Sequence, residues 1–171
     1  MKTTNLFKHT AMFVCAMLFA TISFAQNKPM PSPRDSVSAT INGSTITINY
    51  GSPSVKGRKV WGELVPYDKV WRTGANEATT FTTTKDITVE GKKLTAGTYA
   101  LFAIPTASTW TIIFNKTAKQ WGAFKYDESQ DALRVMVKPM PSAMNERLVY
   151  KMNKKGFTLS WDKLSVPVRI K

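Results

Sequence analysis

Hydrophobic and polar residues alternate along most of this chain with a period of two. Positions 37–41 carry apolar residues at every second place, and positions 46–50 repeat the alternation after Asn42-Gly43. A period of two puts successive side chains on opposite faces of a β-strand. Asn-Gly readily adopts the positive φ angles of a two-residue hairpin turn. This part of the sequence therefore predicts a β-hairpin with one buried face.

The same alternation predicts further short strands, separated by turn residues such as Glu90-Gly91. The expected strands cover residues 78–84, 86–90, 98–104, 110–114, 132–138, 148–152, 157–161 and 166–170. No segment keeps an apolar stripe of helical period over three turns. We therefore expect an all-β domain: an antiparallel β-sandwich, jelly-roll or immunoglobulin-like, with one long irregular loop. A small closed barrel is less favoured, because the long loop would fit it poorly.

The long loop spans residues 51–79, which contain four glycines and two prolines but also two tryptophans. A connection of this length is usually functional or disordered, and the aromatic residues favour an ordered one. We expect Trp61, Leu64, Val65 and Tyr67 to form one helical turn that ends at Pro66 and caps an end of the sandwich. We also expect Gly74 to adopt a positive φ that reverses the chain between Arg72 and Glu77.

Residues 1–25 have the parts of a secretory signal peptide. A leader with two lysines and no acid precedes an apolar run at 11–20, and small residues precede a cleavage site after Ala25. The run is about half the length that a membrane span needs, so we expect no transmembrane segment after cleavage and a periplasmic or extracellular location. Residues 26–35, with three prolines, are expected to form a flexible leader, and 36–171 a single domain.

Cleavage would remove Cys15 and His9, the only cysteine and histidine of the chain. The mature chain would then have no thiol and no imidazole, although an exported protein is free to form disulfides. Cysteine nucleophiles, Ser-His-Asp triads and ordinary zinc sites each need one of these groups. We therefore predict no metal site and no cofactor, and enzymatic activity is the less favoured interpretation.

The mature chain would keep 22 of the 24 basic residues and all 11 acids, a net charge of +11. Such a charge attracts anionic partners. The basic residues are scattered, with short clusters only at 56–59, Lys92-Lys93 and Lys154-Lys155. This scatter favours the alternative that the positive charge serves no specific partner. If there is a partner, we expect an anionic glycan or lipid head group and no nucleic acid.

Arg72, Asn76 and Glu77 are the candidates for binding chemistry in the long loop. Arginine presents a rigid fork of donors to a carboxylate or phosphate. Asparagine both donates and accepts, and glutamate can serve as an acid, a base or an oxygen ligand. The structural alternative is an ion pair between Arg72 and Glu77, with Asn76 holding the loop backbone.

Aromatic side chains offer a second kind of binding group, because their flat faces can stack on sugar rings. The candidates are Trp61, Trp71, Trp121 and Tyr126. Each could equally belong to the hydrophobic core. Trp110 and Trp161 lie in predicted strands with alternating neighbours, and we expect both to be core residues.

Few acids are available for catalysis. Glu63 and Glu77 lie in the long loop, and Asp127, Glu128 and Asp131 form a second group. A glycosidase needs two carboxylates about 5–10 Å apart, a distance that the sequence does not fix. The second group lacks the Asp-x-Asp-x-Asp-Gly spacing of a calcium loop, so we expect an exposed acidic turn there.

Four stretches of the chain carry a resemblance to a known family: KGRKVWGELVPYDKVWRTGANEATTF, EGKKLTAGTYALFAIP, WTIIFNK and QWGAFKYDESQDALRV. Together they resemble the secreted bacterial family known as domain-of-unknown-function family 2911. The resemblance covers nearly all of the mature domain. It implies a compact β-sandwich and brings no activity, cofactor or catalytic residue with it.

Three functional hypotheses follow. The favoured one is a non-catalytic module that binds a polar or anionic ligand of the cell envelope through residues 61–77. The first alternative is a structural or assembly protein of the envelope without a small ligand. The second is a glycan hydrolase that uses carboxylates alone.

Overall fold

The structure is a computed structural model that describes residues 30–171. The predicted signal peptide and residues 26–29 of the predicted leader lie outside the described residues. The end of the predicted leader is not a free linker, because the first strand begins at Arg34. Within the described residues the regular secondary structure is β-strand, apart from a single 3-10 turn, η1, at Glu128–Gln130. No helix of the described part is long and apolar enough to cross a membrane.

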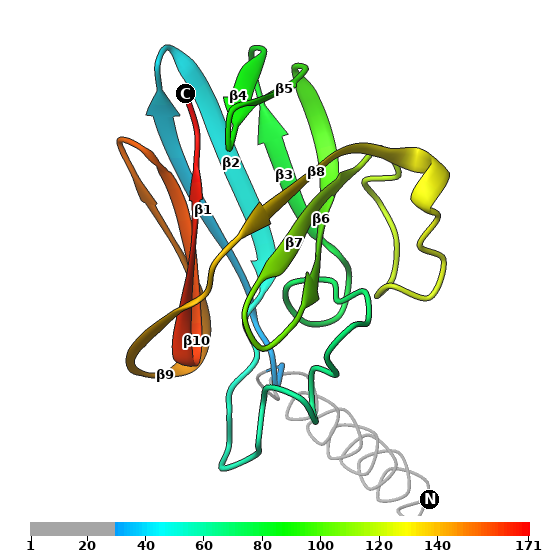
Figure 1. Cartoon of the computed structure of the whole chain (residues 1–171). Helices are drawn as coiled ribbons and strands as arrows, with labels where there is room; N and C mark the ends of the chain where they lie inside the picture. Colours follow the sequence, from blue (N-terminus) through cyan, green and yellow to red (C-terminus); the bar gives the residue numbers. More distant parts are fainter. Residues whose placement is uncertain (1–29) are drawn as a thin grey trace, which may run out of the picture. The chain divides into compact units, whose positions relative to one another are not determined.

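Six strands form one antiparallel sheet in the order β1-β2-β3-β6-β7-β8, seen in Figure 1. Their bounds are β1 Arg34–Ile41, β2 Ser44–Gly51, β3 Thr79–Thr83, β6 Gly97–Pro105, β7 Trp110–Asn115 and β8 Asp131–Val137. Neighbours in the sheet are consecutive along the chain apart from the short hairpin that is inserted between β3 and β6. The sheet is therefore a meander, a simpler connectivity than the jelly-roll or immunoglobulin-like arrangements named above.

Two hairpins pair separately from this sheet. The small one joins β4 Ile87–Val89 to β5 Lys92–Leu94, and the large one joins β9 Met140–Asn153 to β10 Gly156–Arg169. Figure 1 shows the large hairpin facing the six-stranded sheet. One hydrophobic core contains buried side chains of the sheet and of both hairpins. The predicted all-β sandwich is therefore confirmed.

The alternating pattern accounts for this core. In β2 the exposure of the residues alternates along the strand, and Ile46, Ile48 and Tyr50 are buried. They belong to the same core as apolar residues of β10 such as Phe157 and Trp161. Burying one such side chain stabilises the folded state by about 1.5–3 kcal/mol. The apolar face predicted from the alternation is therefore the face that packs in the core.

Most predicted strands are found, with corrections at β5, β9 and β10. Strand β9 begins at Met140, eight residues before the predicted stretch 148–152. Asn42 and Gly43 have φ angles of 49° and 78°, as the hairpin requires. The stretches 157–161 and 166–170 belong almost entirely to the single strand β10, because the register shifts on both sides of Asp162 without ending the pairing with β9. Strand β5 has only three residues, too few for an alternating pattern to be visible.

The outer face of the six-stranded sheet has two parts. A second, smaller core on this face contains Ala100, Phe102 and Ile113, against which Ala123 and Tyr126 pack. The segment between β7 and β8 supplies these two covering residues and so shields part of the face. Further along the sheet, the outward positions of β1, β2, β3 and β6 form a row of hydroxyl side chains: Ser38, Thr47, Thr82 and Thr98.

Candidate functional site

The long loop, residues 51–79, is anchored by tryptophans. Trp71 exchanges two backbone hydrogen bonds with Ala103 of β6, of 2.8 and 2.9 Å. Trp61 is 9% exposed, and its ring lies 4.8 Å from that of Trp110 and 5.8 Å from that of Trp161, centroid to centroid. The ring of Trp71 stacks on Trp161 at 6.0 Å. The four indoles form one cluster in the core, and the expected core positions of Trp110 and Trp161 are confirmed.

Residues 60–65 form a tight turn rather than the expected helical turn. The backbone amide of Val65 donates to the carbonyl of Val60 at 2.8 Å, and Trp61 forms an isolated bridge with Val65. The turn holds Val60, Trp61 and Val65 in buried positions. Burial of these three side chains at the end of the sandwich fixes the turn more strongly than helical propensity does.

Thr73 is the polar centre of the loop. It is buried and has a φ of 52°, and its hydroxyl donates to the carbonyl of Leu101 at 2.9 Å. Its own carbonyl accepts from the hydroxyls of Thr79, at 3.1 Å, and Tyr150, at 3.0 Å. These bonds join the loop to β3, β6 and β9. Thr73 therefore serves the architecture of the loop.

Gly74 does not have the expected positive φ; the left-handed residues are Thr73 and Asn76, the latter with a φ of 64°. Gly74 is required instead by close packing. A Cβ atom on it would lie 2.9 Å from both the carbonyl oxygen of Gly51 and the Oγ1 of Thr79. The chain reversal is thus made by two other residues, and the glycine allows two backbone segments to approach each other.

Asn76 and Glu77 contact the N-terminal part of the domain. The Nδ2 of Asn76 donates to the carbonyl of Ser32 at 3.2 Å. Glu77 is exposed and forms an ion pair with Arg34 of β1. The alternative in which Glu77 neutralises Arg72 is therefore not what the structure has.

Arg72 follows Trp71 in the long loop. It is half-buried, and burial lowers the pKa of its guanidinium below the ordinary value. Its Nε is buried without an acceptor, and no described acid forms an ion pair with it.

A cavity of about 280 Å³ borders this guanidinium, and we name it the Arg72 pocket. Lys69 adds a second cation, and Trp71 and Phe124 add aromatic surface. Phe124 is 86% exposed. Leu64, Pro66, Val70 and Ala123 complete the lining.

Trp121 and Tyr126 lie on the segment between β7 and β8 and differ in exposure. Trp121 is 62% exposed and forms an isolated backbone bridge with Glu77. Tyr126 packs on Phe102 and donates its hydroxyl to Asp131 at 2.6 Å. Trp121 presents an aromatic face to solvent, whereas Tyr126 is held by its neighbours.

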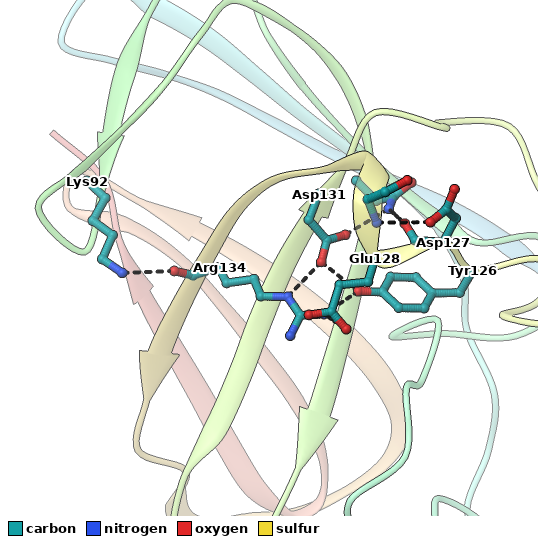
Figure 2. A network of polar contacts seen from close by, with 8 residues as sticks. Lys92, Tyr126, Asp127, Glu128, Asp131 and Arg134 are labelled. Carbon is teal, nitrogen blue, oxygen red and sulfur yellow. Dashed lines mark hydrogen bonds and ion pairs between the residues drawn. The ribbon is translucent and has the colours of Figure 1, made fainter.

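Figure 2 shows the polar network around Tyr126. Arg134 of β8 donates to the Tyr126 hydroxyl at 2.5 Å and to Asp131 at 2.6 Å, and it forms an ion pair with Glu128 at 3.2 Å. Asp127 accepts from the backbone amide of Ser129 at the start of η1. The acids of this turn are therefore engaged with their own chain. The described residues hold no group of three or more acid, histidine or cysteine side chains that is arranged to bind a metal.

We predict that Tyr126→Phe lowers the free energy of unfolding at neutral pH by about 1 kcal/mol, because it removes two partly solvated hydrogen bonds. Burial and the hydrogen bond to Asp131 raise the pKa of Tyr126 to about 12. A folded-state pKa above the unfolded one stabilises the protein below pH 10, and this contribution is lost as the pH rises through about 12. Denaturant titrations from pH 7 to 12 should show a shallower alkaline loss in the variant. An unchanged alkaline slope would contradict this role.

The seven predicted site residues thus do not form one site. Trp61 and Trp71 belong to the core cluster, Arg72 borders the Arg72 pocket, and Tyr126 belongs to the Figure 2 network. Asn76, Glu77 and Trp121 lie where the loop meets the N-terminal strand and the outer face of the sheet. Neither Lys69 nor Phe124 was predicted from the sequence. Lys69 lies three residues before Arg72 in the same long loop, whereas Phe124 reaches the pocket because the segment between β7 and β8 meets that loop.

Comparison with curated proteins and with solved structures gave no significant match. Residues 32–170 match the family model described as "Protein of unknown function (DUF2911)". This match spans the whole sandwich, from the residues before β1 to the end of β10. The chain therefore belongs to the DUF2911 family.

Proposed function

We propose that this domain is a non-catalytic module that binds an anionic ligand of the cell envelope, either an acidic glycan or a lipid head group, at the Arg72 pocket. The supporting observation is the half-buried guanidinium of Arg72, which has no ionic partner in the described part of the chain. The shared chemistry of the two ligand classes is a carboxylate or phosphate oxygen pair.

Comparison with its neighbours in the chain shows why the unpaired guanidinium of Arg72 indicates a ligand. Thr73, Gly74, Asn76 and Glu77 each contact another segment of the domain. The side chain of Arg72 is the exception: the backbone carbonyl accepts from the amide of Thr79 at 3.3 Å, but the guanidinium forms no hydrogen bond or ion pair with a described residue. A buried polar group without a partner costs about 1–3 kcal/mol. A carboxylate or phosphate could accept from the guanidinium with two parallel bonds and remove that cost.

The rest of the Arg72 pocket fits an anion that carries an apolar part. Lys69 supplies a second positive charge, while Trp71 and Phe124 supply aromatic faces. The carboxylate pair required for glycan hydrolysis has no counterpart at this pocket, because no acid lines it. Glu63, the acid of the preceding turn, is exposed and pairs with Lys59 at 3.0 Å. Binding is therefore favoured over catalysis.

We expect Arg72→Ala to abolish capture of the anionic probe while the free energy of unfolding changes by less than about 1 kcal/mol. Arg72→Lys should not restore capture, because one ammonium cannot replace two parallel donors. The probes are uronic-acid and phosphorylated oligosaccharide arrays, and vesicles of phosphatidylglycerol compared with phosphatidylcholine. Arrays and vesicles separate a glycan from a head group.

The matched control is Arg169→Ala, which removes the same charge from a side chain that is 80% exposed and does not line the Arg72 pocket. This variant should capture the probe like the wild type. If both arginine variants lost probe capture equally, the loss would be due to the lower net charge and not to a site at Arg72. A large loss of stability in Arg72→Ala with no probe captured by the wild type would favour the structural alternative.

A further inference from the structure

A second concave surface lies on the outer face of the six-stranded sheet. We name it the sheet groove; its volume is about 730 Å³. Asn49 of β2, Thr80 and Thr82 of β3 and Thr98 of β6 line it, and Lys119 and Gln120 line it from the segment between β7 and β8. None of these residues lines the Arg72 pocket.

Polar groups without a partner gather in the sheet groove. Asn49 and Thr80 lie directly opposite each other in the β2–β3 register, and both are half-buried. Neither side chain makes a hydrogen bond to another described residue, in contrast to Thr82 and Thr98, whose hydroxyls pair at 3.0 Å. Gln120 donates to the carbonyl of Thr117 at 2.7 Å, while its Oε1 is buried and accepts from no described group.

The charges in the sheet groove largely cancel. Glu77 and Arg34 both line it, and they pair with each other. Lys119 is the one further charged group in the lining. An anionic ligand would be repelled by the carboxylate of Glu77 and would compete with it for the guanidinium of Arg34. The sheet groove is therefore better suited to a neutral ligand, unlike the Arg72 pocket.

The unpartnered groups select a ligand that offers donors and acceptors on neighbouring atoms. An amide and a hydroxyl each donate and accept, and the Gln120 oxygen only accepts. The hydroxyls of a sugar provide both functions at short spacing. Ala78 and Ala118 also line the sheet groove, and such small side chains leave room for the C–H face of a sugar ring.

Trp121 is not part of the lining of the sheet groove but is an exposed aromatic residue next to it along the chain. It directly follows Gln120, is 62% exposed, and is tied by its backbone bridge to Glu77 at the sheet groove. An exposed indole offers a flat apolar face with a polar edge. We propose that the sheet groove binds a neutral oligosaccharide, with Asn49, Thr80 and Gln120 bonding its hydroxyls and Trp121 packing on a ring.

The test measures binding of the mature chain to neutral hexasaccharides of glucose, xylose and mannose, by calorimetry. We expect at least one to bind, and Asn49→Ala and Thr80→Val each to weaken it by about tenfold. Neither side chain bonds to another described residue, so melting temperatures should stay close to that of the wild type. Thr40→Val, on the same sheet face but outside the sheet groove, is the matched control and should bind normally.

Arg72→Ala should also leave this affinity unchanged, which separates the sheet groove from the function proposed for the Arg72 pocket. Absence of binding to every neutral hexasaccharide would overturn the proposal. So would equal weakening by Thr40→Val, or weakening by Arg72→Ala alone. Binding of acidic oligosaccharides only, with Asn49→Ala having no effect, would assign glycan capture to the Arg72 pocket and also overturn it.

Discussion

Replacing Trp61 by alanine is expected to lower the free energy of unfolding by about 3–5 kcal/mol, the usual loss for a buried tryptophan. The indole of Trp61 contacts those of Trp71, Trp110 and Trp161 at centroid distances of 4.8–5.8 Å. Its removal would leave a cavity inside this cluster. The other three rings are fixed by strands and by backbone bonds, so the cavity cannot close without moving the sheet.

Denaturant unfolding of Trp61→Ala, followed by far-ultraviolet circular dichroism, checks this value. Trp121→Ala is the control because it removes the same side chain from a position that is 62% exposed, and it should change stability by about 0.5 kcal/mol or less. Similar small losses in the two variants would mean that Trp61 does not serve the core, and would restore it as a candidate for ligand contact.

Gly51→Ala is expected to cost about 3 kcal/mol, at the upper end of what overpacking usually costs. A Cβ atom at this position would lie 2.2 Å from the carbonyl oxygen of Ala75 and 2.9 Å from its carbonyl carbon. These are backbone atoms, so no side-chain rotation can relieve the clash. The peptide of Ala75 would have to move, and with it the loop that Thr73 anchors and that carries Arg72.

Gly57→Ala is the matched control for this substitution. Gly57 lies in the same loop with a φ of 68°, but no atom lies within 4 Å of an added Cβ. It should therefore lose only the about 1 kcal/mol that a left-handed conformation costs a residue with a side chain. Thermal and denaturant unfolding of both variants gives the comparison, and equal losses would show that close packing at Gly51 contributes nothing.

The two stability predictions also bear on binding. Trp61→Ala should loosen the cluster behind the Arg72 pocket, because Trp71 belongs to both. Any ligand captured at the Arg72 pocket should then bind more weakly to Trp61→Ala than to Trp121→Ala. The sheet groove should respond in the opposite order, since Trp121 is its neighbour and Trp61 is not.

The sequence by itself determined the strands and the class of fold. Alternation in β1 and β2 and the Asn42-Gly43 turn are local signals, because the side-chain period and the φ angles concern adjacent residues. The same reasoning placed Trp110 and Trp161 in the core, as found. Reasoning from alternation also predicted two strands where the structure has the single strand β10. The alternation is interrupted around Asp162, and a turn and a β-bulge interrupt it in the same way.

The tertiary structure alone decided how the loop residues are used. Gly74 is needed because Gly51, distant in the sequence, packs against it, and Glu77 pairs with Arg34 rather than with the nearby Arg72. Trp61 and Trp121 are the same residue type, yet one lies in the core and the other in solvent. These outcomes depend on which segments meet in space, and pairings between distant segments leave no periodic trace in the sequence.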